Sequence, residues 1–236
     1  MLLGSNNINL VIIGAGNSTL EIIDIIQDIN KINTNKISIR GILDDNQQLQ
    51  NKKINSIPII GTIKDIKKFK KEKFFLSIFY YKNKFLKEKI LKRISKYHRR
   101  FINIIHPNSI ISEKTKIGFG CLISNNCNIY SGSKIGNFST ISPNVSLAPF
   151  SKIENNCFIG NSTLLSYKSK ISKNTYIGFN CSILENVKIG YGCRVLPNTT
   201  INKSINKTQV IGVFVGAFGG CIILDVFSLF EVNTII

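Results

Sequence analysis

The feature that most constrains this chain is an unbroken period of six residues in its second half. From residue 111 to residue 201, every sixth residue is Ile, Leu or Val. If roughly a third of residues belong to these types, chance gives such a run about once in 10⁷–10⁸ trials. This period predicts a parallel β-helix built from hexapeptide repeats. The aliphatic positions are Ile111, Ile117, Ile123, Ile129, Ile135, Ile141, Leu147, Ile153, Ile159, Leu165, Ile171, Ile177, Ile183, Ile189, Val195 and Ile201.

Other residue types follow the same period. A small residue stands two positions before each aliphatic one, and Asn or Gly is frequent three positions after it. We expect the aliphatic and small residues to point inward, and Asn or Gly to take corners with positive φ. Three hexads close one coil, so the run makes about five coils stacked at the ~4.8 Å strand spacing. The expected corner residues are Gly120, Asn126, Gly132, Asn144, Asn156, Asn174, Asn180, Asn186, Gly192 and Asn198.

The cysteines fit this period. Five of the six occupy the small inward position, where each serves as a small hydrophobe. No CxxC spacing occurs, so neither a metal site nor a disulfide is predicted. Cys221 lies outside the repeat and has no assigned role. The five are Cys121, Cys127, Cys157, Cys181 and Cys193.

The first hundred residues have a different pattern, in which apolar runs alternate with amphipathic ones. A strand over 8–13 precedes Gly14-Ala15-Gly16 and a helix, and a second strand over 37–43 ends at Asp44-Asp45. A short strand (SIPIIG), a basic helix (IKDIKKFKK), a strand (FFLSIF) and a long basic helix to about residue 100 follow. This alternation predicts a small open parallel sheet. Ligands on such sheets bind beyond the carboxyl ends of the strands, where the glycines and the acids fall.

Gly14-Ala15-Gly16 is a weak motif by itself. The third glycine of a dinucleotide fingerprint is missing, because position 19 is Thr. A tight turn without ligand is therefore one interpretation of this segment. Asp44 and Asp45 favour a nucleotide, because acids after the second strand can accept hydrogen bonds from a ribose or a base. Acids in that position also occur in simple turns.

The net charge of +18 is unevenly distributed. Residues 52–100 carry 17 of the 31 Lys and Arg and 3 of the 13 acids, so this stretch holds +14. Its basic segments have helical spacing, which is typical of solvated helix faces. Binding of an anion, whether a nucleotide, a membrane surface or a nucleic acid, is the alternative. No zinc-finger spacing or aromatic RNA-binding motif accompanies the charge, so no nucleic-acid partner is predicted.

Composition sets the remaining limits. A chain of 236 residues that is 43% hydrophobic is not wholly disordered. No apolar run reaches the roughly 18 residues that a membrane span needs. The N-terminal segment lacks a basic flank and a small-residue cleavage site, so no signal peptide is expected. We therefore expect a soluble cytoplasmic protein.

The combination of these parts resembles one family. A short nucleotide-type α/β domain, then IIHPNSIIS, then the hexad repeat is similar to the bacterial sugar acyltransferases of the sialic-acid O-acetyltransferase type. That family includes the enzymes that N-acetylate UDP-4-amino-4,6-dideoxy sugars. The segments that carry the resemblance are IIGAGN (12–17), LDD (43–45), HP (106–107), the repeat and GVFVG (212–216).

The resemblance implies the fold and the domain boundaries. A Rossmann-like sugar-nucleotide-binding domain over residues 1–103 precedes a left-handed β-helix acyltransferase domain over 104–216, and an apolar tail covers 217–236. The resemblance also implies a homotrimer, with acetyl-CoA as co-substrate in the groove between neighbouring β-helices. No metal is implied.

The resemblance further implies site residues. Gly14, Ala15 and Gly16 match the nucleotide-binding loop, and Asp44 and Asp45 match the acids that meet base and ribose. In YIGFNC, two residues match a coil that lines the CoA groove. These two are Gly178 and Asn180.

The sequence departs from the family where the general base is expected. The family's His stands two residues past the aliphatic residue of a middle coil, and this position is Pro149. The chain has no His after His106. Its HP context makes His106 a structural residue at the domain junction rather than a substitute base. Other departures are Ser18 for a His, Phe79-Tyr80-Tyr81 in a loop that normally has Gly and Asn, and the apolar tail.

These features predict an acetyl-CoA-dependent N-acetyltransferase for a UDP-4-amino-4,6-dideoxy sugar in surface glycan biosynthesis. A sugar hydroxyl does not attack a thioester without a base, whereas a neutral amine does, so the missing His favours N-acetylation. The backbone N–H of Tyr167, one coil on from Pro149, is a candidate oxyanion donor, and Glu154 remains a possible base. The alternatives are a sugar O-acetyltransferase and a non-catalytic relative that keeps the trimer.

Overall fold

The computed structural model describes residues 7–79, 84–215 and 221–223 and divides the chain into two compact units. The first unit extends to residue 108 and includes residues 119–125; the second holds 109–118 and the chain from 126 onward. The apolar tail expected over 217–236 lies outside the described residues, except for 221–223.

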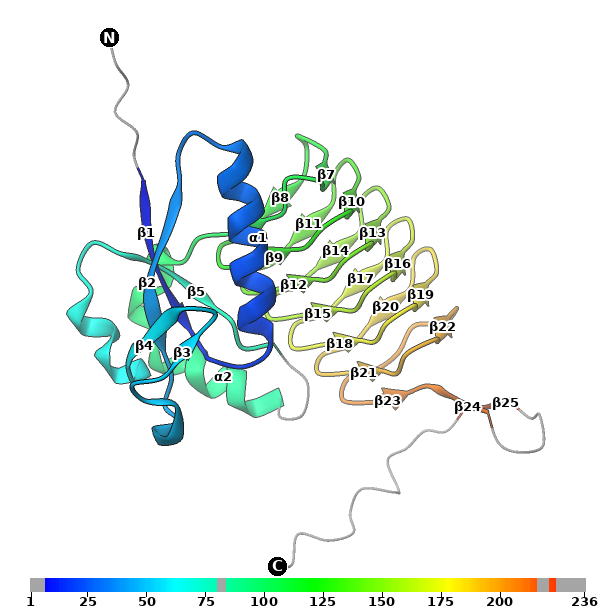
Figure 1. Cartoon of the computed structure of the whole chain (residues 1–236). Coiled ribbons are helices and arrows are strands. Elements are labelled where there is room, and N and C mark those ends of the chain that lie inside the picture. Colours follow the sequence, from blue (N-terminus) through cyan, green and yellow to red (C-terminus); the bar gives the residue numbers. More distant parts are fainter. Residues whose placement is uncertain (1–6, 80–83, 216–220, 224–236) are drawn as a thin grey trace, which may run out of the picture. The chain divides into compact units, whose positions relative to one another are not determined.

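The first unit contains a five-stranded sheet in the order β3-β4-β2-β1-β5 (Figure 1). From β1 the chain passes to β2 on one side, and later returns to β5 on the other side of β1. Strands β2, β1 and β5 are parallel, as the alternating pattern predicts. The strands are β1 (Ile8–Ile13), β2 (Ile37–Leu43), β3 (Lys53–Ile54), β4 (Ile57–Gly61) and β5 (Lys73–Leu76).

Helix α1 (Ser18–Ile32) packs one isoleucine-rich face against this sheet. Its apolar residues recur at helical spacing, and burial of that face stabilises the helix more than its intrinsic propensity does. Lys31 near its end complements the partial negative charge of the helix C-terminus. The buried residues of α1 are Thr19, Ile22, Ile23, Ile25, Ile26 and Ile29.

Two of the expected basic helices are shorter than predicted. The first is a 3₁₀ helix, η2 (Ile63–Lys68), which a capping box of Thr62 and Asp65 begins. The second divides into α2 (Lys84–Arg93) and a 3₁₀ helix, η3 (Ser95–Arg100). The guanidinium of Arg100 donates to the carbonyls of Phe69 and Glu72, which fixes the end of η3. A third 3₁₀ helix is η1 (Gln47–Leu49).

The second unit consists mainly of short parallel strands stacked in three sheets (Figure 1), and its last two strands form a separate antiparallel pair. Paired strands lie 18 residues apart in sequence, as three hexads per coil require; for example, Asn128 pairs with Ser146. Its strands are β7 (Ile110–Ile111), β8 (Lys116–Ile117), β10 (Asn128–Ile129), β11 (Lys134–Ile135), β12 (Thr140–Ile141), β13 (Ser146–Leu147), β14 (Lys152–Ile153), β15 (Phe158–Ile159), β16 (Leu164–Leu165), β17 (Lys170–Ile171), β18 (Tyr176–Ile177), β19 (Ser182–Ile183), β20 (Lys188–Ile189), β21 (Arg194–Val195), β22 (Thr200–Ile201), β23 (Val210–Ile211), β24 (Val213–Val215) and β25 (Cys221–Ile223).

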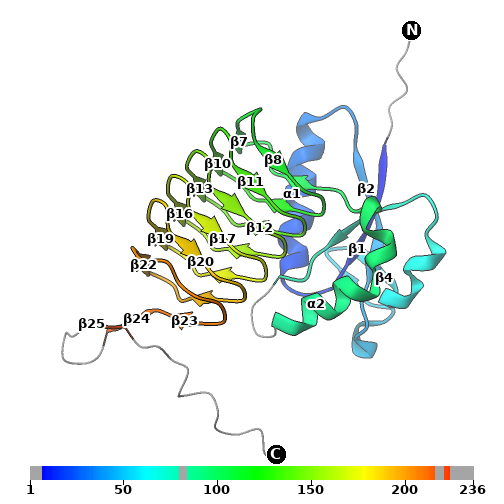
Figure 2. The same ribbon diagram turned by 180° about the vertical axis from the view of Figure 1, so that it is seen from behind.

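We name the three sheets of this unit by their first strands. The β7 sheet contains β7, β10, β13, β16, β19 and β22; the β8 sheet contains β8, β11, β14, β17 and β20. Strands β12, β15, β18, β21 and β23 form the β12 sheet. The first corner follows the β7-sheet strands, the second corner follows the β8-sheet strands, and the third corner follows the β12-sheet strands. Figure 2 shows the stacked strands from behind.

The hexad repeat predicts this unit accurately. Each of the sixteen aliphatic positions is the second residue of a strand, including Ile123 in β9 (Leu122–Ile123) of the first unit. All ten expected Asn and Gly corners have positive φ. The five cysteines in the repeat are free and buried. The repeat extends further than the sequence pattern showed, because β6 (Ile104–Ile105) precedes it and β23 follows it.

Strands β6 and β9 pair with each other within the first unit. Ile104 and Leu122 join the apolar core that α1 forms with the sheet. The hydroxyl of Ser124 donates to the Glu21 carboxylate of α1, at 3.0 Å. These contacts tie residues 119–125 to the nucleotide-type sheet.

Two corner residues depart from the Asn and Gly pattern at the first corner. Phe150 and Lys168 have φ of 61° and 54°, where the neighbouring coils have Gly132 and Asn186. Bulky residues rarely adopt this conformation, and such strain often accumulates near functional sites. Phe138 at the second corner and Ser162 at the third corner have φ of 56° and 57°, so such departures occur at all three corners.

Candidate functional site

The loop Gly14–Ser18 joins β1 to α1 at the point where the strand order reverses. β1 pairs with β2 on one side and with β5 on the other, so the loop faces the carboxyl ends of three parallel strands. Open α/β sheets bind ligands at this point. Gly14 has φ of 101°, and a Cβ there would lie 2.7 Å from Cγ1 of Ile78. The loop geometry therefore requires glycine at residue 14.

Thr19 explains why the third glycine of the dinucleotide fingerprint is absent. Its side chain is fully buried, and its hydroxyl donates to the Gly14 carbonyl at 2.8 Å. The same hydroxyl lies 3.0 Å from the Ser77 hydroxyl at the end of β5. Ser18 donates to the Ser77 carbonyl at 2.7 Å. Hydroxyl groups thus fasten the loop to β5, so a third glycine is not needed for close packing.

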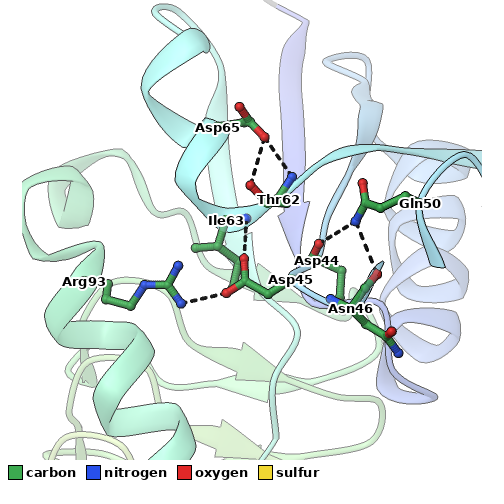
Figure 3. Close-up of polar contacts among 8 residues, drawn as sticks. All are labelled: Asp44, Asp45, Asn46, Gln50, Thr62, Ile63, Asp65 and Arg93. Carbon is green, nitrogen blue, oxygen red and sulfur yellow. Dashed lines mark hydrogen bonds and ion pairs between the residues drawn. The ribbon is translucent and has the colours of Figure 1, made fainter. Parts of the chain in front are cut away.

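Asp44 and Asp45 lie at the end of β2 beside this loop, as the sequence predicts. The Asp44 carboxylate accepts from the Ala15 N–H at 2.7 Å and from the Asn46 N–H at 2.8 Å. The Asp45 carboxylate accepts from the Ile63 N–H at 3.0 Å (Figure 3). Both acids therefore organise the loops around the strand ends.

Arg93 of α2 pairs with the Asp45 carboxylate at 2.6 Å, and Figure 3 shows its side chain reaching toward that acid. Sequence reasoning did not single out this residue. The concentration of positive charge in 52–100 was the only available signal, and it does not distinguish Arg93 from the other cations of that stretch. The structure places this one at the strand ends and leaves both members of the pair partly exposed.

These residues line a cavity of about 490 Å³ in the first unit. This volume falls in the range of small-molecule sites. One part of the wall is polar, with the glycine loop and the two acids. Another part is apolar, and two cations, Lys89 and Arg93, belong to the lining. The apolar residues that line it are Ile63, Ile78, Phe79, Leu86 and Ile90. Phe79 is the described part of the altered loop; Tyr80 and Tyr81 lie outside the described residues.

His106 has no ring nitrogen left for catalysis. Its Nδ1 accepts from the Asn108 N–H at 3.1 Å, so the neutral ring carries its proton on Nε2. Nε2 lies 3.2 Å from the Asp28 carboxylate. The side chain is 10% exposed. His106 therefore has the contacts of a structural residue that anchors the start of the repeat to α1.

Pro149 and Tyr167 occupy equivalent positions of the first corner on successive coils. The Pro149 carbonyl accepts from the Lys168 N–H at 3.2 Å. Within the described residues, the Tyr167 N–H makes no hydrogen bond. The Tyr167 ring meets the Phe150 ring edge-on, with centroids 5.9 Å apart. A backbone donor is thus available beside a small aromatic surface.

Glu154 lies at the second corner, at the other end of β14 from Pro149. Its carboxylate accepts from the Lys173 N–H at 3.0 Å and pairs with Lys170 at 3.2 Å. Burial raises the pKa of Glu154, but these two partners outweigh it, so the pKa lies below its usual value. A carboxylate that is held ionised at a different corner is poorly suited as the base.

Gly178 and Asn180 lie at the third corner, where packing alone explains both residues. A Cβ at Gly178 would lie 2.5 Å from the Pro197 nitrogen on the next coil. Asn180 has φ of 52°, and its side-chain amide donates to Asn198 at 2.9 Å. The structure thus gives each a role in the coil, and their part in a CoA groove stays a prediction.

We expect Gly178→Ala to lower the free energy of unfolding by about 3 kcal/mol, because the new methyl group meets backbone that cannot move aside. Thermal or urea unfolding measures the change. Gly16→Ala is the matched control, since a Cβ at that position meets nothing within 4 Å. Equal stability of the two variants would contradict this packing argument.

Known proteins resemble this chain in sequence and in structure. Residues 9–94 match the sequence profile of the PglD N-terminal domain family. The structure is similar to perosamine N-acetyltransferase from Caulobacter crescentus, solved with CoA and GDP-perosamine: TM-score 0.76, 16% identity, 89% of this chain and 94% of that chain covered. The acetyltransferase domain of PglB from Neisseria gonorrhoeae, solved with acetyl coenzyme A, has a TM-score of 0.77 and 18% identity, with 87% of this chain and 96% of that chain covered. WeeI from Acinetobacter baumannii has a TM-score of 0.76 and 19% identity, with 92% of this chain and 100% of that chain covered.

The chain has the hexapeptide-repeat acyltransferase fold. The fold class predicted from the sequence, an α/β domain followed by a left-handed parallel β-helix, is therefore confirmed. No curated protein sequence matches the chain significantly. The likeness extends over both units, since each of these structures is covered almost completely.

Two features are absent from the described residues. None of their helices is long and apolar enough to cross a membrane. Over the same residues, no three His, Cys, Asp or Glu side chains gather as metal ligands would.

Proposed function

We propose that this protein is an acetyl-CoA-dependent N-acetyltransferase whose substrate is a nucleotide-linked amino sugar. The observation that carries the proposal is the cavity at the switch point of the first unit, in a chain with the hexapeptide-repeat acyltransferase fold. The perosamine enzyme that shares this fold was solved with CoA and a nucleotide-linked sugar. A UDP-4-amino-4,6-dideoxy sugar, as a step in surface glycan biosynthesis, is the finer form of the proposal.

The cavity suits a nucleotide in shape and charge. Asp44 and Asp45 offer carboxylate oxygens to a base or ribose, while Lys89 and Arg93 offer positive charge to a diphosphate. The apolar wall near Phe79 and Ile90 suits the face of a base. Gly14, Ala15 and Gly16 form the loop that brings backbone close to the ligand.

The proposed reaction needs no enzyme base. The lone pair of a neutral sugar amine attacks the thioester carbonyl carbon, and a C–N bond forms. The carbonyl oxygen, on which negative charge develops, accepts a hydrogen bond from a backbone N–H such as that of Tyr167. The C–S bond then breaks, and the CoA thiolate leaves. The proton that the amine loses passes to the thiolate or to water, and Pro149 in place of His is tolerated.

The exposed apolar residues of the second unit favour association with other copies, as a homotrimer. They gather on the β7 sheet and on its two bordering corners, whereas the second corner has one exposed aromatic among the described residues, Tyr191. Contiguous exposed apolar surface marks association sites. Pro149, Tyr167 and Gly178 border this sheet, so a groove between copies would pass them. The gathered residues are Ile110, Tyr130, Phe150, Leu164, Tyr167, Phe179 and Leu184.

We expect Leu164→Lys to convert the assembly to monomers, because a charge at the middle of the β7 sheet is not tolerated in a buried contact. Light scattering coupled to gel filtration measures the mass. The control variant Lys134→Gln, whose substitution lies on the β8 sheet, should keep the mass of a trimer. A monomeric wild-type protein would contradict the trimer.

Asp45→Ala should weaken the binding of a UDP-linked sugar by about tenfold, as the loss of one ligand hydrogen bond implies. Asp44→Ala should also release the Ala15 N–H, so we expect a loss of stability of about 1 kcal/mol there. Calorimetry measures both affinities. Asp24→Ala, on the exposed side of α1, is the control. Unchanged affinity in both variants would show that the cavity is not the nucleotide site.

The proposal as a whole is tested by mixing the protein with acetyl-CoA and a panel of UDP- and GDP-linked amino sugars. Release of the CoA thiol is followed, and the product is identified by mass. We expect turnover with at least one amine and none with the matched hydroxyl sugar. Turnover with the hydroxyl sugar alone would instead establish an O-acetyltransferase.

A non-catalytic relative is the second candidate function. Pro149 favours it, because the position expected for the base cannot take up a proton. Thiol release that never exceeds background, together with measurable nucleotide-sugar binding, would establish this function.

A further inference from the structure

Five lysines form a ladder on the outer face of the β8 sheet. Each is the first residue of its strand, and the pairing places it directly beside the lysine of the next strand. At ~4.8 Å per strand, the ladder extends over roughly 19 Å. Lys170 is half-buried, and the other four members are exposed. The members are Lys116, Lys134, Lys152, Lys170 and Lys188.

Composition does not account for this ladder. In the second unit, none of the equivalent outward positions on the described β7-sheet and β12-sheet strands is a lysine. They carry Ile, Asn, Ser, Leu and Thr on the β7 sheet, and Thr, Phe, Tyr, Arg and Val on the β12 sheet. A chain rich in lysine would scatter it over all three faces. Here lysine fills one face and is excluded from the other two.

The ladder is unfavourable for the coil itself. Like charges placed side by side on adjacent strands repel each other. Among the described residues, one ladder lysine has an acidic partner: Lys170 pairs with Glu154 at 3.2 Å, and both are partly exposed. Exposed pairs of this kind contribute little to stability. A face kept for structure alone would not retain five stacked charges, so the charge points to a partner.

The shape of the face indicates the kind of partner. The strands of this face are two residues long, and four of the ladder lysines line an open hollow of about 450 Å³ along them. None of these strands is a helix or ribbon that could enter the groove of a nucleic acid. The cations are all lysines, which act as hydrated point charges, whereas arginine is preferred for paired contacts to individual phosphates. A row of point charges on one open face complements an extended anionic surface. Anionic membrane surfaces attract nearby basic residues by about 1 kcal/mol for each Lys or Arg, so a face with five lysines is attracted strongly.

We propose that the lysine ladder docks the β-helix onto a membrane surface that contains anionic lipid. This interaction is peripheral and electrostatic, because the outward positions of the described β8-sheet strands hold lysines and no apolar side chain to insert between lipids. It does not depend on the proposed acetyl transfer, since none of the ladder lysines is given a part in that reaction.

The test compares sedimentation with vesicles of phosphatidylcholine alone and with vesicles of phosphatidylcholine and phosphatidylglycerol in equal parts. The ladder variant is Lys134→Gln/Lys152→Gln/Lys188→Gln. The control variant removes three exposed lysines of the same unit that lie off the ladder, Lys114→Gln/Lys203→Gln/Lys207→Gln. Both variants lose the same net charge. A third variant, Lys134→Arg/Lys152→Arg/Lys188→Arg, keeps the ladder charge.

We expect wild type, the control and the arginine variant to bind the anionic vesicles and to leave the neutral ones unbound. Each lysine near an anionic surface contributes roughly a fivefold factor, so the ladder variant should lose about a hundredfold in partitioning at low salt. It should also melt at a higher temperature than wild type, because repulsion is relieved.

Three results would overturn the proposal. The first is a wild-type protein that does not bind anionic vesicles. The second is an equal loss in the ladder and control variants, which would assign binding to net charge. The third is a ladder variant that keeps vesicle binding while losing affinity for duplex DNA, which would identify a nucleic-acid surface. If the triple glutamine variant does not fold, the single variant Lys152→Gln replaces it. We expect this variant to bind anionic vesicles roughly fivefold more weakly than wild type, and binding equal to wild type would overturn the proposal.

Discussion

The acetylation rate of an amino-sugar substrate should rise about tenfold per pH unit and level off at the pKa of the substrate's own amine. The reason is that the proposed mechanism uses an amine that is already neutral. The fraction of neutral amine, rather than the ionisation of an enzyme group, then sets the rate. The measurement is kcat/KM over a range of pH at fixed ionic strength. A second apparent pKa that belongs to the free enzyme would contradict this mechanism.

His106→Ala is the matched test of the same prediction. Both ring nitrogens of His106 already have partners, Asn108 and Asp28, so its loss should leave most of the activity. Because the ring is buried, the folded fraction must be measured, and His106→Asn offers a variant that keeps a polar group there. Loss of most of the activity in a folded variant of either kind would show that His106 takes part in the reaction.

The repeat made the second unit predictable because each hexad repeats the same local rule. An inward aliphatic residue, a small interior residue and a corner residue are all defined by short-range spacing. Asn126 and Gly132 could be assigned to positive φ before any coordinates were known, since few other residues adopt it readily. The exceptions at Phe150 and Lys168 break the rule, and no local signal announced them.

The first unit was less predictable because its details depend on contacts between distant residues. Strands β1, β2, β4 and β5 and the first helix were predicted from apolar runs, whereas β3, which pairs antiparallel with β4, was not. The basic stretches, however, were predicted as long helices. The first ends at Lys68, where the next carbonyl, that of Phe69, accepts from the distant Arg100, and the second divides between Arg93 and Ser95. The pairing of Arg93 with Asp45 joins residues 48 positions apart. Sequence spacing does not show such a pair.

The candidate site, too, was predicted only in part from the sequence. The glycine loop and the two acids were predicted from their places after strands, and the cavity lies there. The sequence did not show that Asp44 holds the Ala15 N–H. In the repeat, the lysine ladder was present in the sequence at intervals of 18 residues, but it becomes a single face only when three hexads close a coil.

Pro149→His should raise the rate at which a hydroxyl sugar is acetylated by a factor of at least about a hundred over the parent protein. A hydroxyl attacks the thioester only when a base removes its proton, and the resemblance places that base at residue 149. Amine acetylation should change little, because a neutral amine does not need the base. The rate with the hydroxyl sugar should rise through a pKa near that of histidine, about 6.5.

The corner can accept this substitution. Pro149 donates no hydrogen bond, and within the described residues the N–H groups of Ser131, Tyr167 and Glu185, which hold the same corner position, make none either. A backbone N–H at residue 149 would therefore need no partner within the coil, as at these three positions. The one backbone contact of Pro149, its carbonyl with the Lys168 N–H, is kept by any residue. Circular dichroism and the melting temperature should match those of the parent.

Glu185→His is the control, because it places an imidazole at the same corner two coils away. It should not acetylate the hydroxyl sugar, since general-base catalysis requires hydrogen-bond reach of the reacting group. If both variants gain O-acetylation equally, the imidazole acts without positioning and the first corner is not the reaction site. If Pro149→His folds, keeps amine acetylation and gains nothing with the hydroxyl, the base position inferred from the resemblance is wrong for this coil.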